Sequence, residues 1–93
     1  MAVLLITYDL ETPTKDYPKI LDLIKKYDHL FLTKSSYLVN TEDTSKFWDE
    51  ISKTIDKSTR LCIFPVTTSL VISSFPNSSE SKKLDEWIHA RIQ

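Results

Sequence analysis

Apolar runs and amphipathic stretches alternate along the chain. Ala2–Tyr8 is nearly continuous apolar sequence with β-branched residues, which predicts a strand buried on both faces. Leu30–Thr33 and Ser36–Asn40 are two shorter strand candidates, and the two residues between them suit a tight hairpin turn. Arg60–Val66 is a further apolar run that contains Pro65. Because proline cannot donate to a ladder, this run predicts an edge strand or a bulge.

Helical spacing of apolar residues marks three other segments. Tyr17–Tyr27 and Phe47–Ile55 each carry an apolar stripe with polar residues on the other faces. Leu84–Ile92 carries a third stripe, and Asn77 followed by Glu80 resembles a capping box ahead of it. We therefore expect three helices, and we interpret the tryptophans on the second and third stripes, Trp48 and Trp87, as core residues rather than base-stacking platforms. A tryptophan on the terminal helix could equally anchor a partner.

The order of these elements is β-α-β-β-α-β, followed by the apolar triplet Leu70–Ile72 and the last helix. This order predicts an α+β fold of the ferredoxin-like, or split βαβ, type, with a short extra strand at the triplet and a C-terminal helix. In that pattern the first and third strands are central and the fourth lies at an edge. The highly apolar first strand and the position of Pro65 both agree with it.

The length of 93 residues predicts one domain spanning 1–93. A chain this short buries only about 60–65% of its unfolded surface, so a partner subunit would stabilise it appreciably. The sequence contains no glycine. Glycine-rich phosphate loops are therefore excluded, and any turn that needs a positive φ falls to Asn or Asp.

The net charge and the cysteine content limit the classes of partner and the cellular compartment that we expect for this protein. The net charge is −1, with ten lysines and only two arginines, Arg60 and Arg91. Since phosphate affinity depends on Lys and Arg, this composition disfavours a tight, autonomous DNA binder and leaves only a local basic patch open. There is no apolar run near the roughly 20 residues that span a bilayer, and the start lacks a basic region of the signal-peptide kind. Cys62 is the only cysteine, and we interpret it as a core residue; we expect a cytoplasmic protein with no membrane contact.

Asp9 is the residue with the most specific candidate chemistry. It ends the most apolar strand, where a carboxylate can hold Mg²⁺ or Mn²⁺ or can simply shape the turn by bonding to its own downstream backbone. A bound metal would polarise a phosphodiester and lower the pKa of a bound water. The neighbouring Tyr8 could stack on a base or bond a phosphate, or it could pack at the end of the sheet. Glu11 is either a second ligand or a solvated loop acid.

Three stretches of the sequence are similar to a known family. The opening "LLITYDLETPTKDYPKIL", the segment "KSSYLVNT" and the helix around "KLDEWI" resemble the Cas2 family of CRISPR-associated proteins, and more closely its small SinR-like members. The resemblance covers almost the whole chain, and its N-terminal part is the most specific. It implies a ferredoxin-like homodimer in which Leu70, Val71 and Ile72 pair across the dimer. It also implies that Asp9 is the family's aspartate.

Cas2 proteins are variously metal-dependent nucleases and non-catalytic scaffolds. Their sequences typically carry basic residues, often paired arginines, soon after that aspartate, whereas this chain has Lys15 and Lys19 without an arginine. One hypothesis is thus a homodimer that acts on or beside RNA or DNA, with Tyr8, Lys15 and Lys19 contacting nucleic acid. In it, Asp9 and its symmetry mate either hold Mg²⁺ or Mn²⁺ for phosphodiester hydrolysis or are the relic of such a site, in a weak or vestigial phosphodiesterase. The alternative is a non-catalytic module that binds a protein partner as an adaptor, inhibitor or immunity-type protein.

Overall fold

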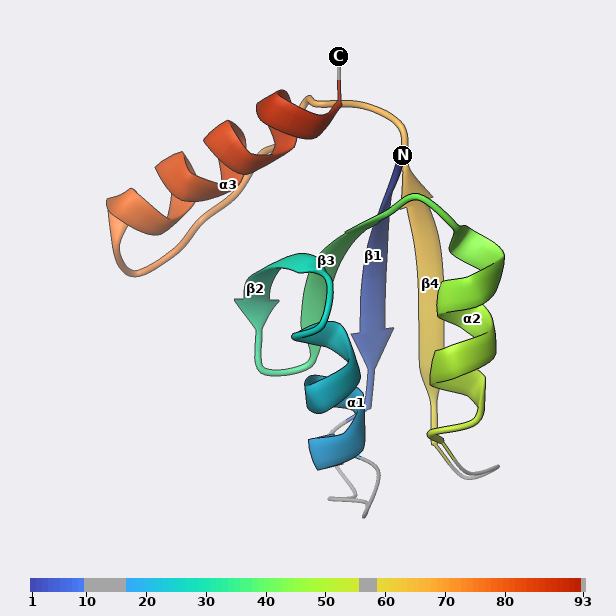
Figure 1. The fold of residues 1–93 in the computed structure, drawn as a ribbon. Helices are drawn as coiled ribbons and strands as arrows, with labels where there is room; N and C mark the ends of the chain where they lie inside the picture. Colours follow the sequence, from blue (N-terminus) through green and yellow to red (C-terminus); the bar gives the residue numbers. More distant parts are fainter. Residues whose placement is uncertain (10–16, 56–58, 93) are drawn as a thin grey trace.

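A four-stranded antiparallel sheet with the strand order β2-β3-β1-β4 forms the centre of the structure (Figure 1). The computed structural model describes residues 1–9, 17–55 and 59–92. The elements are β1 (Ala2–Tyr8), α1 (Tyr17–Ile24), β2 (Asp28–Thr33), β3 (Ser36–Thr41), α2 (Thr44–Ser52), β4 (Leu61–Val66) and α3 (Ser78–Arg91). This α+β arrangement is compatible with the ferredoxin-like pattern that the sequence predicts.

β1 lies between β3 and β4, as its apolar sequence predicts. Val3, Leu4 and Ile6 are all buried, although successive side chains of a strand point to opposite faces of the sheet. The prediction that β1 is covered on both faces is therefore confirmed. The predicted bounds of β1 match the observed ones, and the other strands differ from their predictions by one or two residues.

β4 is an edge strand, and the backbone pattern shows how it accommodates Pro65. The Asp9 N–H donates to the Arg60 carbonyl at 3.0 Å, and Leu4 lies opposite Pro65 in the register. Because hydrogen-bonded and non-bonded pairs alternate along an antiparallel ladder, the Leu4–Pro65 pair is a non-bonded one. The proline nitrogen thus faces the open edge, where no ladder bond is lost, and the prediction of an edge position is confirmed.

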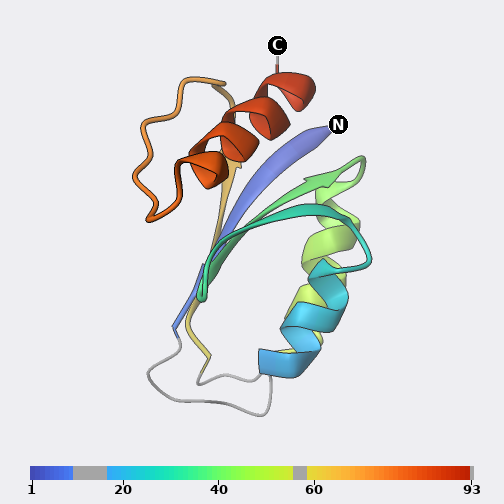
Figure 2. The same cartoon turned by 90° about the vertical axis from the view of Figure 1, so that its left-hand side faces the viewer.

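α1 and α2 cover one face of the sheet (Figure 2). Their apolar stripes meet the inward side chains of β1 and β3 in a cluster that includes Ile20, Ile24, Phe47 and Ile51, all at most 1% exposed. The Tyr27 ring packs edge-on against Phe47, with 5.0 Å between ring centroids. Burying each of these large side chains contributes about 1.5–3 kcal/mol. Among the described residues, this cluster contains ten buried residues and the cluster on the other face contains four, so this face supplies most of the core.

α3 lies on the opposite face of the sheet, and it covers only the part near the start of β1 (Figure 2). Leu84 and Ile88 of the helix pack on Val3 and Leu38. Farther along the same face, Phe64 is exposed beside Leu5, its partner in the register. The second face is therefore only partly covered within one chain.

Side-chain caps and turns replace the glycine that the chain lacks. The Asp43 carboxylate accepts from the Lys46 N–H at the start of α2. The Asn77 amide oxygen accepts from the Ser79 N–H at the start of α3, so the predicted cap is confirmed at Asn77. Lys34 and Ser35 form the turn between β2 and β3, as predicted. Among the described residues no φ angle is positive, so these turns need no left-handed residue.

Three predictions about side chains or strands are wrong. Leu70–Ile72 forms no strand, because no strand of the described residues lies beside it to pair with. Cys62 is exposed rather than part of the core. It shares a face of β4 with Phe64 and Val66, and of these only Val66 packs against the α3 cluster. Trp48 is 51% exposed, because the buried side of α2 is the one that carries Phe47 and Ile51. Trp87 is only partly buried, packed against the α3 cluster.

Arg91 ties α3 to the edge strand β2. Its Nε and Nη2 atoms donate to the two carboxylate oxygens of Asp28 at 2.6 and 3.0 Å. The same guanidinium lies 4.1 Å from the centre of the Trp87 ring and donates to the Trp87 carbonyl. The hydrogen bonds from Arg91 hold the pKa of the Asp28 carboxyl below its usual value of 3.8, against the opposing effect of burial. This pair therefore helps to fix the direction in which α3 crosses the sheet.

We expect Asp28→Asn to lower the free energy of unfolding at pH 7 by about 0.5–1 kcal/mol, because the pair is bidentate but half open to solvent. A carboxyl whose pKa is depressed by folding stabilises the protein above its unfolded pKa, and this contribution disappears as the pH falls through the lower folded pKa. In urea unfolding over a pH series, the difference in the free energy of unfolding between wild type and variant should therefore shrink as the pH falls into the acid range. Asp22→Asn, at an exposed position of α1, serves as the control, and a gap that stays constant with pH would contradict this account.

Candidate functional site

The end of β1 opens into a shallow depression of about 260 Å³. Asp9 continues the ladder with β4 through its N–H bond to the Arg60 carbonyl, which places its side chain at the rim of the sheet. The depression is lined by Thr7, Tyr8 and Asp9 from β1 and its end, and by Arg60, Leu61 and Cys62 from β4 and its start. The structure thus places Asp9, the predicted acid, at the same depression as Arg60 and Cys62, which are about fifty residues away in the sequence.

The described residues offer an incomplete set of ligands for a divalent cation at this place. Among residues 1–9, 17–55 and 59–92, no group of three or more His, Cys, Asp or Glu side chains is close enough to hold a metal ion. Arg60 lines the same depression as Asp9, and a guanidinium disfavours a cation beside it. The described residues therefore do not by themselves fit Mg²⁺ or Mn²⁺, and a metal at Asp9 would need further oxygen ligands. Glu11, the predicted second ligand, lies outside the described residues.

Tyr8 packs at the end of the sheet, which is one of the two roles that the sequence left open for it. The residue is 5% exposed, and its hydroxyl donates to the Lys34 carbonyl at 3.4 Å. This bond joins the end of β1 to the turn between β2 and β3. In this arrangement the Tyr8 ring belongs to the core and offers no open face to a base.

Of the two lysines predicted to contact nucleic acid, only Lys19 lies within the described residues. Lys19 lies on α1 and is exposed, so it is accessible to a phosphate. Lys15, like Glu11, lies outside the described residues. Contact of Tyr8, Lys15 and Lys19 with nucleic acid stays a prediction.

The segment predicted to pair across a dimer, Leu70–Ile72, carries two solvent-exposed apolar side chains. Leu70 is 79% exposed and Ile72 is 96% exposed, whereas Val71 between them packs against the α3 cluster. This alternation follows the two-residue period of an extended chain, in which neighbouring side chains point to opposite sides. Leu70 and Ile72 are therefore directed away from the chain that carries them.

An apolar groove between α2 and β4 was missed in the sequence. It has a volume of about 450 Å³, and its lining includes Leu61, Ile63 and Pro65 of β4 together with Phe47 and Trp48 of α2. The helical period could have indicated it, because Trp48 lies one position beyond Phe47 and so falls beside the buried stripe rather than within it. Its position next to the open edge of β4 depends on the sheet order, which the sequence shows only indirectly.

Comparison with known proteins gives no further support for a family. No protein-family model matches the chain, and no curated protein matches it significantly. The similarity to Cas2 therefore rests on the residues of the sequence. Among the described residues, no helix is long and apolar enough to cross a membrane.

We expect Cys62 to react with Ellman's reagent in the folded protein, because its side chain is exposed in the single chain. It is the only cysteine, so the released chromophore measures this position alone. The rate in dilute native protein should approach the rate in urea. Reaction only after denaturation would mean that Cys62 is covered, and repeating the measurement at lower protein concentration would show whether a second copy covers it.

Proposed function

We propose that the chain is a Cas2-like, ferredoxin-like protein that works as a homodimer and holds partners together beside nucleic acid, without hydrolysing it. The bare apolar pair Leu70 and Ile72 is the observation on which this proposal rests. Two large apolar side chains that are almost fully exposed and share one side of an extended segment are typical of an interface. The resemblance to Cas2 supplies the expectation that the segment pairs with a second copy, in the cytoplasm as the sequence suggests.

The open edge of β4 is the surface we assign to that segment. Because the Leu4–Pro65 pair is non-bonded, the backbone groups of Leu61, Ile63 and Pro65 face outward. They offer two N–H donors and three carbonyl acceptors to an added strand, since proline has no N–H. An open edge of this kind is prone to uncontrolled association unless another strand covers it.

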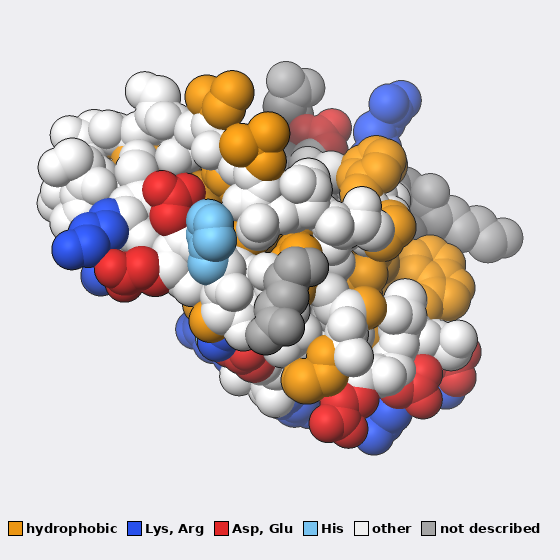
Figure 3. Space-filling view, turned by 90° about the horizontal axis from the view of Figure 1, so that it is seen from above, with side chains coloured by type: hydrophobic (Ala, Val, Ile, Leu, Met, Phe, Trp, Pro, Cys, Tyr) orange, Lys and Arg blue, Asp and Glu red, His pale blue; other side chains and the backbone are white. Residues whose placement is uncertain are grey.

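The groove beside this edge gives the apolar pair a place to bind. The side chains of Leu61, Ile63 and Pro65 line it from the strand, and Trp48 flanks it from α2. A strand added to β4 places every second side chain over this groove, which is the spacing of Leu70 and Ile72. Seen from above, hydrophobic side chains lie open on the surface of the molecule between groups of charged residues (Figure 3). Burying both pairs in a symmetric dimer would remove this apolar surface from water.

The composition supports assembly rather than hydrolysis. The net charge of −1 and the two arginines give little to neutralise a phosphate backbone, so contact with nucleic acid would be weak and sensitive to salt. A dimer that binds other proteins needs no such charge. The exposed lysines, Lys19 among them, would then contribute local contacts only.

A second candidate function is metal-dependent phosphodiester hydrolysis by paired Asp9 residues. The observation in its favour is the position of Asp9 at the exposed rim, in a depression that a phosphate oxygen could reach. A bound Mg²⁺ or Mn²⁺ would supply polarisation of the phosphodiester and an activated water. The part of this chain would be to hold the ion between two symmetry-related carboxylates, which requires that the ends of the two β1 strands face each other.

We expect the double variant Leu70→Asp, Ile72→Asp to remain folded and to become monomeric. Substituting exposed residues changes monomer stability by no more than about 0.5 kcal/mol, whereas the lost apolar burial should raise the dimer dissociation constant about a hundredfold or more. Analytical ultracentrifugation over a concentration series measures this constant. Phe31→Ser, a half-exposed apolar residue on β2, is the matched control and should stay dimeric. A monomeric wild-type protein, or a variant that dimerises as well as the wild type, would exclude this interface.

The distance between the two β1 ends can be measured with a spin label on the single cysteine. Cys62 lines the same depression as Asp9, so a nitroxide there reports on the Asp9 positions without any substitution. If the ends face each other, the label-to-label distance by pulsed electron resonance is well below the 34 Å length of one chain. A longer distance would exclude the paired site.

The catalytic role of Asp9 is tested separately, with labelled RNA and DNA and added Mg²⁺ or Mn²⁺. The assembly proposal predicts that wild type and Asp9→Asn are equally inactive. Metal-dependent cleavage by the wild type that the variant loses would establish the second function and overturn the non-catalytic one.

A further inference from the structure

Another pocket lies at the β2 edge of the sheet, opposite to the β4 edge and under the first turns of α3. In Figure 1 this helix extends beyond β2, the outermost strand on that side. The pocket has a volume of about 190 Å³, and its walls are Leu30 and Leu32 of β2 with Leu84 of α3 and Phe75 from the segment before that helix. Its two charged members, Glu80 and Lys83, both belong to α3.

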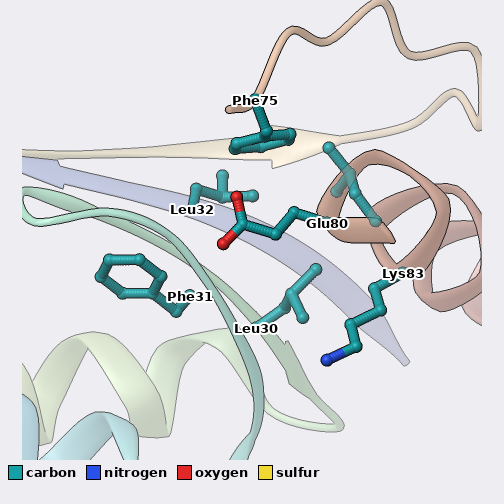
Figure 4. Close-up of a pocket in the computed structure, with 7 residues that line it drawn as sticks. Leu30, Phe31, Leu32, Phe75, Glu80 and Lys83 are labelled. Carbon is teal, nitrogen blue, oxygen red and sulfur yellow. The ribbon is translucent and has the colours of Figure 1, made fainter. Parts of the chain in front are cut away.

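The carboxylate of Glu80 lies inside this pocket. Figure 4 shows it between the Phe75 ring and Leu32, while the Lys83 ammonium extends past Leu30 in another direction. No ion pair or hydrogen bond holds the Glu80 side chain among the described residues; the salt bridges there join Lys82 to Glu86 and Arg91 to Asp28. Glu80 is accessible from solvent, so a ligand can reach it. An exposed carboxylate beside apolar side chains can bind a cation through charge-assisted hydrogen bonds while the cation's apolar stem packs on those side chains.

The backbone of β2 offers hydrogen bonds beside the pocket. The Tyr8 N–H donates to the Ser35 carbonyl, which sets the alternation along β3 so that Leu38 and Asn40 are the residues bonded toward β2. His29 and Phe31, opposite Val39 and Tyr37, therefore direct their N–H and carbonyl groups outward. Each of them can donate one hydrogen bond to an added strand and accept one from it.

We infer that this edge binds an extended segment of another protein, which adds to β2 and inserts an arginine side chain into the Glu80 pocket. The backbone bonds to His29 and Phe31 hold the segment, and the carboxylate selects the inserted residue. This surface lies at the edge of the sheet opposite to β4, so it is independent of the proposed dimer contact.

The pocket suits arginine in three ways. The aliphatic stem packs on Leu30 and Leu84, as long cationic side chains do over apolar surface. The planar guanidinium can bind both oxygens of the Glu80 carboxylate. It can also stack on the Phe75 ring, which lies directly beside that carboxylate in Figure 4. Lysine would make the charge contact without the bidentate geometry or the stacking, so we expect it to bind less tightly.

The test uses an N-acetylated, C-amidated pentapeptide of sequence TVRVT and the same peptide with citrulline in place of arginine. Citrulline keeps the shape and removes the charge. NMR titration of ¹⁵N-labelled full-length protein should shift the amide signals of His29 and Phe31 together with those of Glu80. We expect the citrulline peptide to bind at least about tenfold more weakly, because a charge-assisted contact is lost.

Three single variants on α3 assign the selectivity to the pocket. Glu80→Gln should weaken binding of the arginine peptide at least about tenfold and remove its advantage over citrulline. Lys83→Gln should bind it equally or more tightly, since a nearby like charge is removed. Glu86→Gln is the matched control, because this carboxylate is exposed on the same helix outside the pocket, and it should bind like the wild type.

Equal affinity for the arginine and citrulline peptides, or equal losses in Glu80→Gln and Glu86→Gln, would overturn the inference. So would the absence of amide shifts at about 1 mM peptide, the weakest affinity that we regard as specific. The Leu70→Asp, Ile72→Asp variant should bind the peptide like the wild type. A loss of binding there would show that the peptide occupies the dimer surface, and it would overturn the assignment to β2 while leaving the dimer proposal intact.

Discussion

The pairing of β1 along both of its edges is the constraint on which the rest of the structure depends. β1 bonds to β3 on one side and to β4 on the other, and side chains of both its faces are buried. An apolar strand of this kind is stable only in the middle of a sheet with cover on each face. The helices α1 and α2 supply that cover on one face, and α3 supplies part of it on the other.

The central position of β1 also determines where open surface remains. With β3 and β1 in the middle, β2 and β4 become the edges, and each carries outward backbone groups. A single helix on the second face leaves Phe64 and Cys62 open. The features with candidate function, which are the Asp9 depression, the α2–β4 groove and the Glu80 pocket, all lie along these two edges. The two edges are therefore where the fold leaves backbone groups and apolar side chains open to a partner.

The two edges differ in the partner that they suit. At β4 the adjoining groove is apolar, and the chain itself carries an exposed apolar segment that matches it, which favours a second copy. At β2 the pocket contains a carboxylate without a partner among the described residues, and the chain's own Arg91 is already bound to Asp28. A protein with one self-associating edge and one edge for another protein can join a dimer to two further molecules.

The sequence by itself determined the four strands and three helices that form, their order and the edge position of β4, because the hydrophobic period and the missing N–H of Pro65 are local properties. It further predicted a strand at Leu70–Ile72 that this chain does not form. It also placed Asp9 at the end of the central strand and Leu70 and Ile72 in one apolar segment. Only the tertiary structure decided which apolar residues are covered. The sequence predicted Cys62 and Trp48 to be core residues, because the hydrophobic pattern shows only which face of an element is apolar. Whether a side chain on that face is exposed depends on whether another element packs against it. In the same way, the strand register places Arg60 beside the same depression as Asp9, and the direction of α3 places Glu80 in the same pocket as Leu32. Local sequence encodes neither.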